Sequence, residues 1–159
     1  MNTKNFKRVN PFNYFGGKTR YLDFILPLIP HGTYTHYYED FCGSASVFFN
    51  KKKDPIETIN DIDGRLINFF KVLRTEPERL VEQLLLTPYS RSEFQQALGE
   101  DTDPVEQARR YFVRTMMAFG SAGSTKRRVN SFRIGFTESR NGRAMASHLK
   151  PAMPTTSNF

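Results

Sequence analysis

Apolar positions in the first part of the chain alternate between helical and strand-like spacing. Residues 19–29 predict a helix, because their apolar side chains recur at steps of three and four. These side chains are Leu22, Ile25, Leu26 and Ile29. Two short runs, 37–41 and 56–60, predict strands. Residues 44–50 lie between them and predict a helix that begins after a turn at Gly43.

Helical patterns continue after the second predicted strand. Asp63 is a residue type that caps helices, and it precedes an apolar pattern over 65–73. The order helix, strand, helix, strand, helix predicts an α/β sheet with parallel strands. Beyond Thr75 the pattern is wholly helical, with short amphipathic segments at 78–86 and 92–98.

A longer helix is expected to begin at Asp103. This acid can act as a cap, Pro104 then occupies the first helical position, and Glu106 follows three residues after the cap. Apolar residues after this start form one stripe, which predicts a core-facing surface rather than a ligand site. The stripe consists of Val105, Ala108, Phe112, Met116 and Phe119.

Composition limits the class of protein. The 159 residues, 38% of them hydrophobic, suit one domain with a packed core. No apolar run is long enough to cross a membrane, and the first residues do not resemble a secretory signal. A single cysteine, Cys42, excludes an internal disulfide, and the three histidines show no metal-ligand spacing. We therefore expect a cytoplasmic protein without a metal.

Charge is distributed unevenly along the chain. Residues 1–108 carry 13 Lys and Arg against 15 Asp and Glu, whereas residues 109–159 carry 10 against the single acid Glu138. A basic half indicates either a solvated basic face or a polyanion partner. Interleaved side chains that can stack on bases or bond to them, such as Phe132 and Asn130, favour nucleic acid.

The turn at Gly43 and the acid Asp61 predict a site for an adenosine-containing cofactor. A glycine turn after one strand lets the backbone approach a ligand, and a carboxylate about 20 residues later accepts hydrogen bonds from ribose hydroxyls. A dinucleotide site would have further glycines where this chain has Ala45 and Phe48. The carboxylates near the turn, among them Glu39, favour a cationic ligand without phosphate. S-adenosylmethionine has these properties.

A second glycine-rich segment, Gly16-Gly17-Lys18, precedes the first predicted helix. It lacks the earlier glycine and the preceding strand of a phosphate-binding loop, so a nucleoside triphosphatase is disfavoured. Either the glycines let the chain pass close to a ligand, or they form a structural turn with an exposed lysine.

Three segments in order resemble the Dam-like, D12-class DNA adenine-N6 methyltransferases. They are FGGK at 15–18, EDFCGSASVFFN at 39–50 and NDIDGRLINFFKVLR at 60–74. The resemblance covers about residues 10–140 and implies a partial Rossmann-like α/β sheet that binds S-adenosylmethionine, with a helical, basic target-recognition region. It divides the chain into a cofactor-binding half at 1–75 and a DNA target-recognition region at 76–145. The tail 146–159 has no periodicity and is expected to be disordered.

The resemblance also implies roles for individual residues. Tyr14 and Lys18 would contact the methionine end or the adenine of the cofactor, and Asp61 would hold the ribose. Two more residues would line the pocket with Gly43; they are Glu39 and Phe41. The basic region would bind double-stranded DNA through Arg127, Arg128 and Arg133.

One family element is missing from the sequence. Members carry an Asp/Asn-Pro-Pro-Tyr/Phe segment that orients the flipped adenine, and this chain contains no Pro-Pro dipeptide. We therefore expect the N-terminal portion of such an enzyme, truncated and inactive alone, with no assigned catalytic residue. The alternatives are a non-catalytic DNA-binding remnant and a methyltransferase acting on RNA or on a small molecule.

Overall fold

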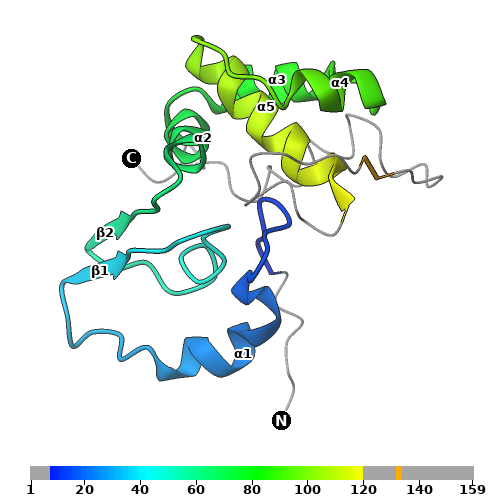
Figure 1. Ribbon diagram of the computed structural model, residues 1–159. Coiled ribbons are helices and arrows are strands. Elements are labelled where there is room, and N and C mark those ends of the chain that lie inside the picture. The colour runs from blue at the N-terminus through cyan, green and yellow to red at the C-terminus, as the bar shows by residue number, and fades with distance from the viewer. Residues whose placement is uncertain (1–7, 120–131, 134–159) are drawn as a thin grey trace.

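The structure is a computed structural model that describes residues 8–119 and 132–133 (Figure 1). Its elements in chain order are η1 Lys18–Tyr21, α1 Leu22–Ile25, η2 Leu26–Leu28, β1 His36–Glu39, β2 Ile56–Ile59, α2 Gly64–Thr75, α3 Pro77–Leu85, α4 Arg91–Gln96 and α5 Pro104–Met117. Helices α2 to α5 gather on one side of the molecule, and the two strands lie with α1 on the other (Figure 1). The described chain is therefore a mixed helix and strand structure, which agrees with the predicted α/β class.

The two strands pair in parallel, as the sequence predicts. Glu39 lies opposite Ile59 at their carboxyl ends. The pairing continues past both strands, because the Asn60 N–H donates to the Glu39 carbonyl at 2.9 Å and the Cys42 N–H donates to the Asn60 carbonyl at 2.9 Å. These bonds hold the segments that follow β1 and β2 side by side, so the glycine turn and the acidic segment meet at one edge.

A buried lysine fixes the loop that leads into β2. The Lys51 side chain has no solvent exposure, and its ammonium contacts the carboxylates of Asp54, at 2.6 Å, and Glu57. The same ammonium lies 4.2 Å from the ring centroid of Tyr37 on β1. One cation therefore links β1, the loop before β2, and β2 itself.

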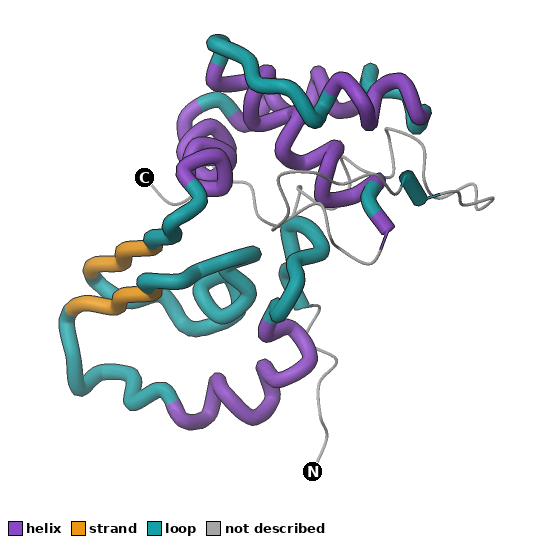
Figure 2. Tube along the Cα trace, viewed as in Figure 1, coloured by secondary structure: helices purple, strands orange, loops and turns teal. Residues whose placement is uncertain are grey.

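The predicted helix at residues 44–50 is not formed. The segment runs through consecutive turns and is drawn as loop between the strands (Figure 2). Ala45 has a φ of 52°, a left-handed conformation that a right-handed helix cannot contain. The Phe48 N–H donates to the Glu39 carboxylate at 3.2 Å instead of to the preceding turn. Two backbone bonds of helical spacing remain, from the Phe49 N–H to the Ala45 carbonyl at 3.0 Å and from the Lys51 N–H to the Val47 carbonyl at 2.9 Å, so the segment forms turns without a continuous helix.

The predicted helix at residues 19–29 is present only as three short helical pieces. Pro27 has no N–H to continue the ladder, and η2 around it has the tighter 3-10 geometry. Leu22 is buried as expected, but Phe24 and Leu28 are 72% and 65% exposed. The apolar spacing thus predicted a helical region and the burial of Leu22 correctly, but the continuous helix that it predicted is not formed.

The helices on the opposite side begin where the sequence predicts. The side chains of Asp63, Ser90 and Asp103 accept hydrogen bonds from the backbone N–H groups of Arg65, Glu93 and Val105. These caps start α2, α4 and α5 respectively. Each cap contributes about 1 kcal/mol to helix stability, because it satisfies a donor that has no partner within the helix.

An aromatic cluster joins the N-terminal segment to α2 and α5. The Phe12 ring is 1% exposed, and its centroid lies 5.2 Å from that of Phe69 on α2 and 5.7 Å from that of Tyr111 on α5. Phe69 stacks on Phe112 at 5.9 Å. The segment before Tyr14 is therefore anchored between two helices, and this anchoring positions Tyr14.

The apolar stripe predicted for α5 is correct over its first three members. Val105, Ala108 and Phe112 are fully buried, whereas Met116 is only partly buried. Phe119 is 68% exposed, so its assignment to the core is wrong. The helix ends at Met117 and the next residue is extended, which turns Phe119 off the buried face.

Candidate functional site

The glycine turn after β1 and the carboxylate after β2 are in direct contact. The Gly43 N–H donates to Oδ2 of Asp61 at 3.0 Å, and Oδ1 of Asp61 accepts from the Asp63 N–H at 3.1 Å. Gly43 has a φ of 50°, and a Cβ at this position would lie 2.8 Å from Cε1 of Tyr14. Only glycine fits between the Tyr14 ring and the strand ends, so three of the predicted site residues form one contiguous cluster.

Tyr14 lies half-buried against this cluster. Burial raises the pKa of its hydroxyl, and the charges of Asp61 and Asp63 raise it further. Tyr14 therefore remains protonated and can donate a hydrogen bond to a ligand. Burial also raises the pKa of Cys42 to about 12, so this thiol is not a nucleophile at neutral pH.

Glu39 is partly engaged within the protein. Its Oε2 accepts from the Tyr37 hydroxyl at 3.1 Å and from the Phe48 N–H at 3.2 Å. Burial raises the pKa of Glu39, while these two bonds and the charge of Lys18 oppose the rise. The carboxylate thus supports the turns after β1 and adds negative charge close to the predicted site.

The Gly-Gly-Lys segment lies against the turns that follow Gly43. The hydroxyls of Thr19 and Ser46 are 3.0 Å apart, and those of Ser46 and Ser44 are 2.8 Å apart. Lys18 is exposed and donates to the Gly16 carbonyl at 3.3 Å. Hydroxyl contacts therefore hold the two glycine-containing segments together.

Phe41 does not pack against the rest of the cluster. Its side chain is 85% exposed, although it is next to the buried Cys42. Ile62, between two acids, is 95% exposed. Sequence reasoning missed Ile62, and the signal that could have found it is an apolar residue placed between Asp61 and Asp63. The two exposed apolar side chains follow the two strands of the sheet.

The residues predicted to contact DNA are mostly outside the described part. Arg127 and Arg128 fall there, whereas Arg133 lies beside the end of α5. Its backbone N–H donates to the Met117 carbonyl at 2.7 Å, and its carbonyl accepts from the Tyr89 hydroxyl at 2.7 Å.

Three arginines of the basic half are not exposed, unpaired charges that could contact DNA. Arg109 pairs with Glu93 at 2.9 Å, and Arg110 pairs with Asp101 at 2.8 Å. Arg114 is 2% exposed. The excess of positive charge available to a polyanion is therefore smaller than the sequence count indicates.

An apolar hollow of about 540 Å³ lies between β2, α2 and the turns after β1. It is lined by Phe48, Phe49, Glu57, Thr58, Ile59, Ile67, Phe70, Lys71, Leu73 and Arg74. None of these is a predicted site residue. The hollow offers neither a glycine turn nor the Asp61 carboxylate, so it does not have the features of a site for an adenosine cofactor.

Two further findings concern the described residues alone. No three or more of their His, Cys, Asp and Glu side chains are grouped so that they could hold a metal ion. None of their helices has the length and apolar character needed to span a membrane.

The geometry of the two strand ends defines a class of protein. Two parallel strands end at one edge, where a glycine turn after the first contacts a carboxylate after the second, as in α/β proteins that bind nucleotide-type cofactors. Comparison with known proteins then gives the family. Residues 14–139 match the D12 class N6 adenine-specific DNA methyltransferases, and the chain belongs to this family.

Two curated relatives are similar over part of the chain. The type II methyltransferase M1.LlaDCHI of Lactococcus lactis subsp. cremoris is 36% identical over 89 residues, which are 55% of this chain and 30% of the relative. The modification methylase StsI of Streptococcus sanguinis is 37% identical over 76 residues, which are 47% of this chain and 11% of the relative. The matched part of the chain thus spans less than a third of either relative.

Proposed function

We propose that this chain supplies the cofactor-binding part of a DNA methyltransferase that transfers a methyl group from S-adenosylmethionine to adenine N6. The observation that carries the proposal is the 3.0 Å bond from the Gly43 N–H to Asp61, with the Tyr14 ring packed against the glycine. This contact joins the two strand ends at which a Rossmann-like sheet binds a nucleoside. The Rossmann-like character of the full sheet is part of the proposal.

The charge and shape of the site suit S-adenosylmethionine. Glu39, Asp61 and Asp63 surround the turn, and they favour a ligand with cationic groups over one with a diphosphate. Asp61 accepts one backbone bond on each oxygen, and a carboxylate has further lone pairs that can accept from ribose hydroxyls. The exposed side chains of Phe41 and Ile62 supply apolar surface for the adenine ring.

In this assignment each residue binds or orients, and none performs covalent chemistry. Tyr14 donates from its protonated hydroxyl, and Lys18 contacts the methionine end or the adenine. Gly43 allows close approach of the backbone, while Glu39 supports the turns below it. When bound, the cofactor supplies an activated methyl group, so positioning accounts for most of the rate. Arg127, Arg128 and Arg133 are proposed to contact double-stranded DNA.

Isothermal titration calorimetry tests the cofactor site. S-adenosylhomocysteine, the demethylated cofactor, should bind the wild type, and Asp61→Asn should weaken binding at least tenfold, because a charge-assisted hydrogen bond is lost. Asp23→Asn is the matched control, since the Asp23 side chain is 82% exposed on α1. Equal affinity in Asp61→Asn and the wild type contradicts the assignment of Asp61.

A second experiment tests activity. A polypeptide of these 159 residues contains no Pro-Pro dipeptide, so it is expected to transfer no labelled methyl groups to double-stranded DNA. Turnover comparable to that of a longer family member would disprove this expectation. Salt-sensitive DNA binding without cofactor affinity would instead identify a non-catalytic DNA-binding protein. Preference for RNA in a competition assay would identify an RNA methyltransferase.

A further inference from the structure

Arg114, in the interior of α5, is a buried charge without an adequate partner. Its residue is 2% exposed, and its Nε and Nη2 atoms have no hydrogen-bond partner in the described structure. No described carboxylate lies within ion-pair distance of it. Burial lowers the pKa of Arg114 and the nearby charge of Arg65 lowers it further, while Tyr111 and the charge of Asp63 oppose the fall. The net direction is downward, so the site disfavours the cation that it contains.

A second unpaired donor lies one helical turn away. The Tyr111 hydroxyl is buried and also has no hydrogen-bond partner among the described residues. Residues three apart on a helix are neighbours, and the Arg114 guanidinium lies 5.2 Å from the Tyr111 ring centroid. The cation–π contact stabilises the charge only in part, and it satisfies none of the three free donors.

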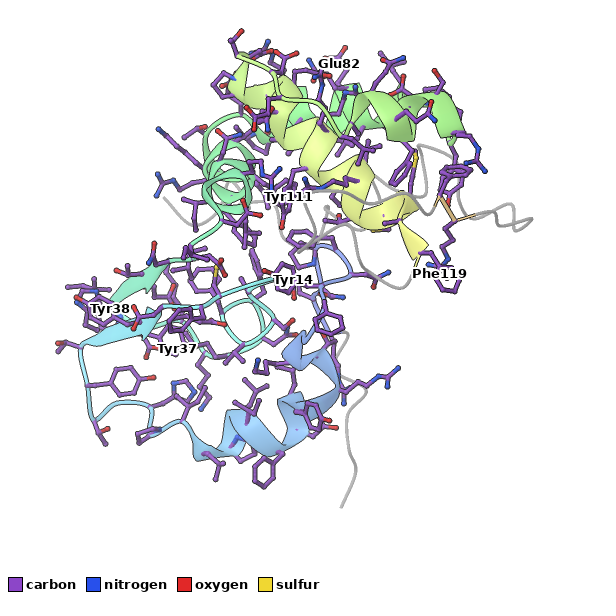
Figure 3. The ribbon with its side chains drawn as sticks, in the orientation of Figure 1. Tyr14, Tyr37, Tyr38, Glu82, Tyr111 and Phe119 are labelled. Atoms are coloured by element: carbon purple, nitrogen blue, oxygen red, sulfur yellow. The ribbon has the colours of Figure 1, made fainter. Side chains whose placement is uncertain are left out.

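This donor cluster adjoins the proposed cofactor site. Burial raises the pKa of Tyr111, and the charges of Asp63, Tyr14 and Asp61 raise it further, which indicates that these groups are near one another. Figure 3 shows Tyr111 and Tyr14 in the middle of the molecule, between the helical side and the strands. Phe12 contacts both rings, with centroid distances of 5.7 Å to Tyr111 and 6.3 Å to Tyr14.

A buried guanidinium with two unpaired nitrogen donors is costly. Buried polar groups in native proteins are almost always hydrogen-bonded, so each exception requires an explanation. Three donors and a positive charge are complementary to an oxyanion, which accepts on several lone pairs. A hydrocarbon or a cation would leave the donors unsatisfied.

We propose that Arg114 and the Tyr111 hydroxyl form a binding site for an oxyanion of the ligand, next to the Gly43 and Asp61 cluster. The carboxylate of the cofactor's methionine end and a DNA phosphate both carry this chemistry. The first source rests on the proposed function, whereas the second requires only that the protein bind DNA. The site assigns a function to a region that the sequence marks only as a basic, helical segment.

Three ligands distinguish the two sources. S-adenosylhomocysteine carries the carboxylate, 5′-methylthioadenosine lacks it, and a DNA duplex carries phosphates. If the carboxylate is bound, Arg114→Met weakens S-adenosylhomocysteine binding at least tenfold and leaves methylthioadenosine binding unchanged. If a phosphate is bound, the same variant weakens duplex binding at least tenfold. Tyr111→Phe weakens binding of the same ligand by a smaller factor.

Stability separates this role from a structural one. Arg114→Met removes a buried, unpaired charge, so its melting temperature should equal or exceed that of the wild type. Arg110→Met is the control on the same helix, and it should leave all three affinities unchanged. Unaltered binding of every ligand to Arg114→Met would overturn the oxyanion site. If the wild type binds neither nucleoside ligand, the proposed function fails, and the duplex measurement alone decides the site.

Discussion

Gly43→Ala tests the contact on which the proposed site depends. The glycine has a φ of 50°, and an added Cβ would lie 2.8 Å and 2.9 Å from two carbons of the Tyr14 ring. Left-handed geometry costs alanine about 1–2 kcal/mol. Displacing a packed ring costs about a further 1–3 kcal/mol. We therefore expect the free energy of unfolding to fall by about 2–5 kcal/mol.

Two other glycines separate these contributions. Gly16 has a φ of 76° but no atom within 4 Å of an added Cβ, so Gly16→Ala should show the backbone cost alone, about 1–2 kcal/mol. Gly64 has neither restriction at the start of α2, and Gly64→Ala should be neutral or stabilise by up to about 1 kcal/mol. The expected order of stability is Gly64→Ala, then Gly16→Ala, then Gly43→Ala.

Urea unfolding followed by circular dichroism gives the three free energies, and equal slopes indicate that the unfolded states are comparable. A double-mutant cycle with Tyr14→Ala then isolates the ring contact. Removing the ring should recover about 1–3 kcal/mol of the loss in Gly43→Ala. If Gly43→Ala destabilises no more than Gly16→Ala, or if the cycle shows no coupling, the close packing of Tyr14 does not explain the glycine.

Three further predictions concern other parts of the structure. Phe41→Ala and Ile62→Ala should each weaken S-adenosylhomocysteine binding in calorimetry while changing the free energy of unfolding by less than about 0.5 kcal/mol, because both side chains are exposed; the exposed Phe24→Ala is the control, and equal affinity in all variants would contradict an adenine contact. Asp103→Ala should destabilise the protein by about 1 kcal/mol in urea unfolding, because it removes the cap of α5, and no loss would show that the cap is unimportant. Hydrogen bonds from Arg109 hold the pKa of Glu106 below its ordinary value of 4.5, so the stability that Glu106 contributes is present above that value and is lost as the pH falls through the folded-state pKa. Glu106→Gln should therefore weaken the acid dependence of stability, measured between about pH 3 and pH 6, and an unchanged profile would refute this coupling.

Local signals in the sequence predicted much of the fold. The caps at Asp63 and Asp103 were predicted from their residue type and the residues that follow them, because a cap depends on one side chain and the next few N–H groups. The parallel pairing of β1 and β2 was also predicted, from the order of elements. Both inferences rest on rules that act over short distances or on connectivity.

Local sequence signals could not show that the helix expected at 44–50 is not formed. Small residues at its start suggested a helix, but Ala45 is left-handed and the Phe48 N–H bonds to Glu39 on the preceding strand. These choices depend on where β1 places its carboxylate, which no local pattern contains. Arg114 was overlooked for a related reason. It is buried on α5, a helix that packs against α2, α3 and α4, whereas its residue type suggests a surface charge.

In the proposed assignment, the N-terminal segment couples folding to cofactor binding. Phe12 is buried between α2 and α5, and Tyr14, two residues later, packs on Gly43. The two ring centroids are 6.3 Å apart and only one residue separates them in the chain, so we expect a shift of Phe12 to disturb the Tyr14 ring as well. A cofactor that contacts Tyr14 only in the folded state therefore stabilises the aromatic cluster as well, by an amount that grows with ligand concentration. Phe12→Ala should consequently lower both the free energy of unfolding in urea and the affinity for S-adenosylhomocysteine in calorimetry, and unchanged affinity would refute this coupling.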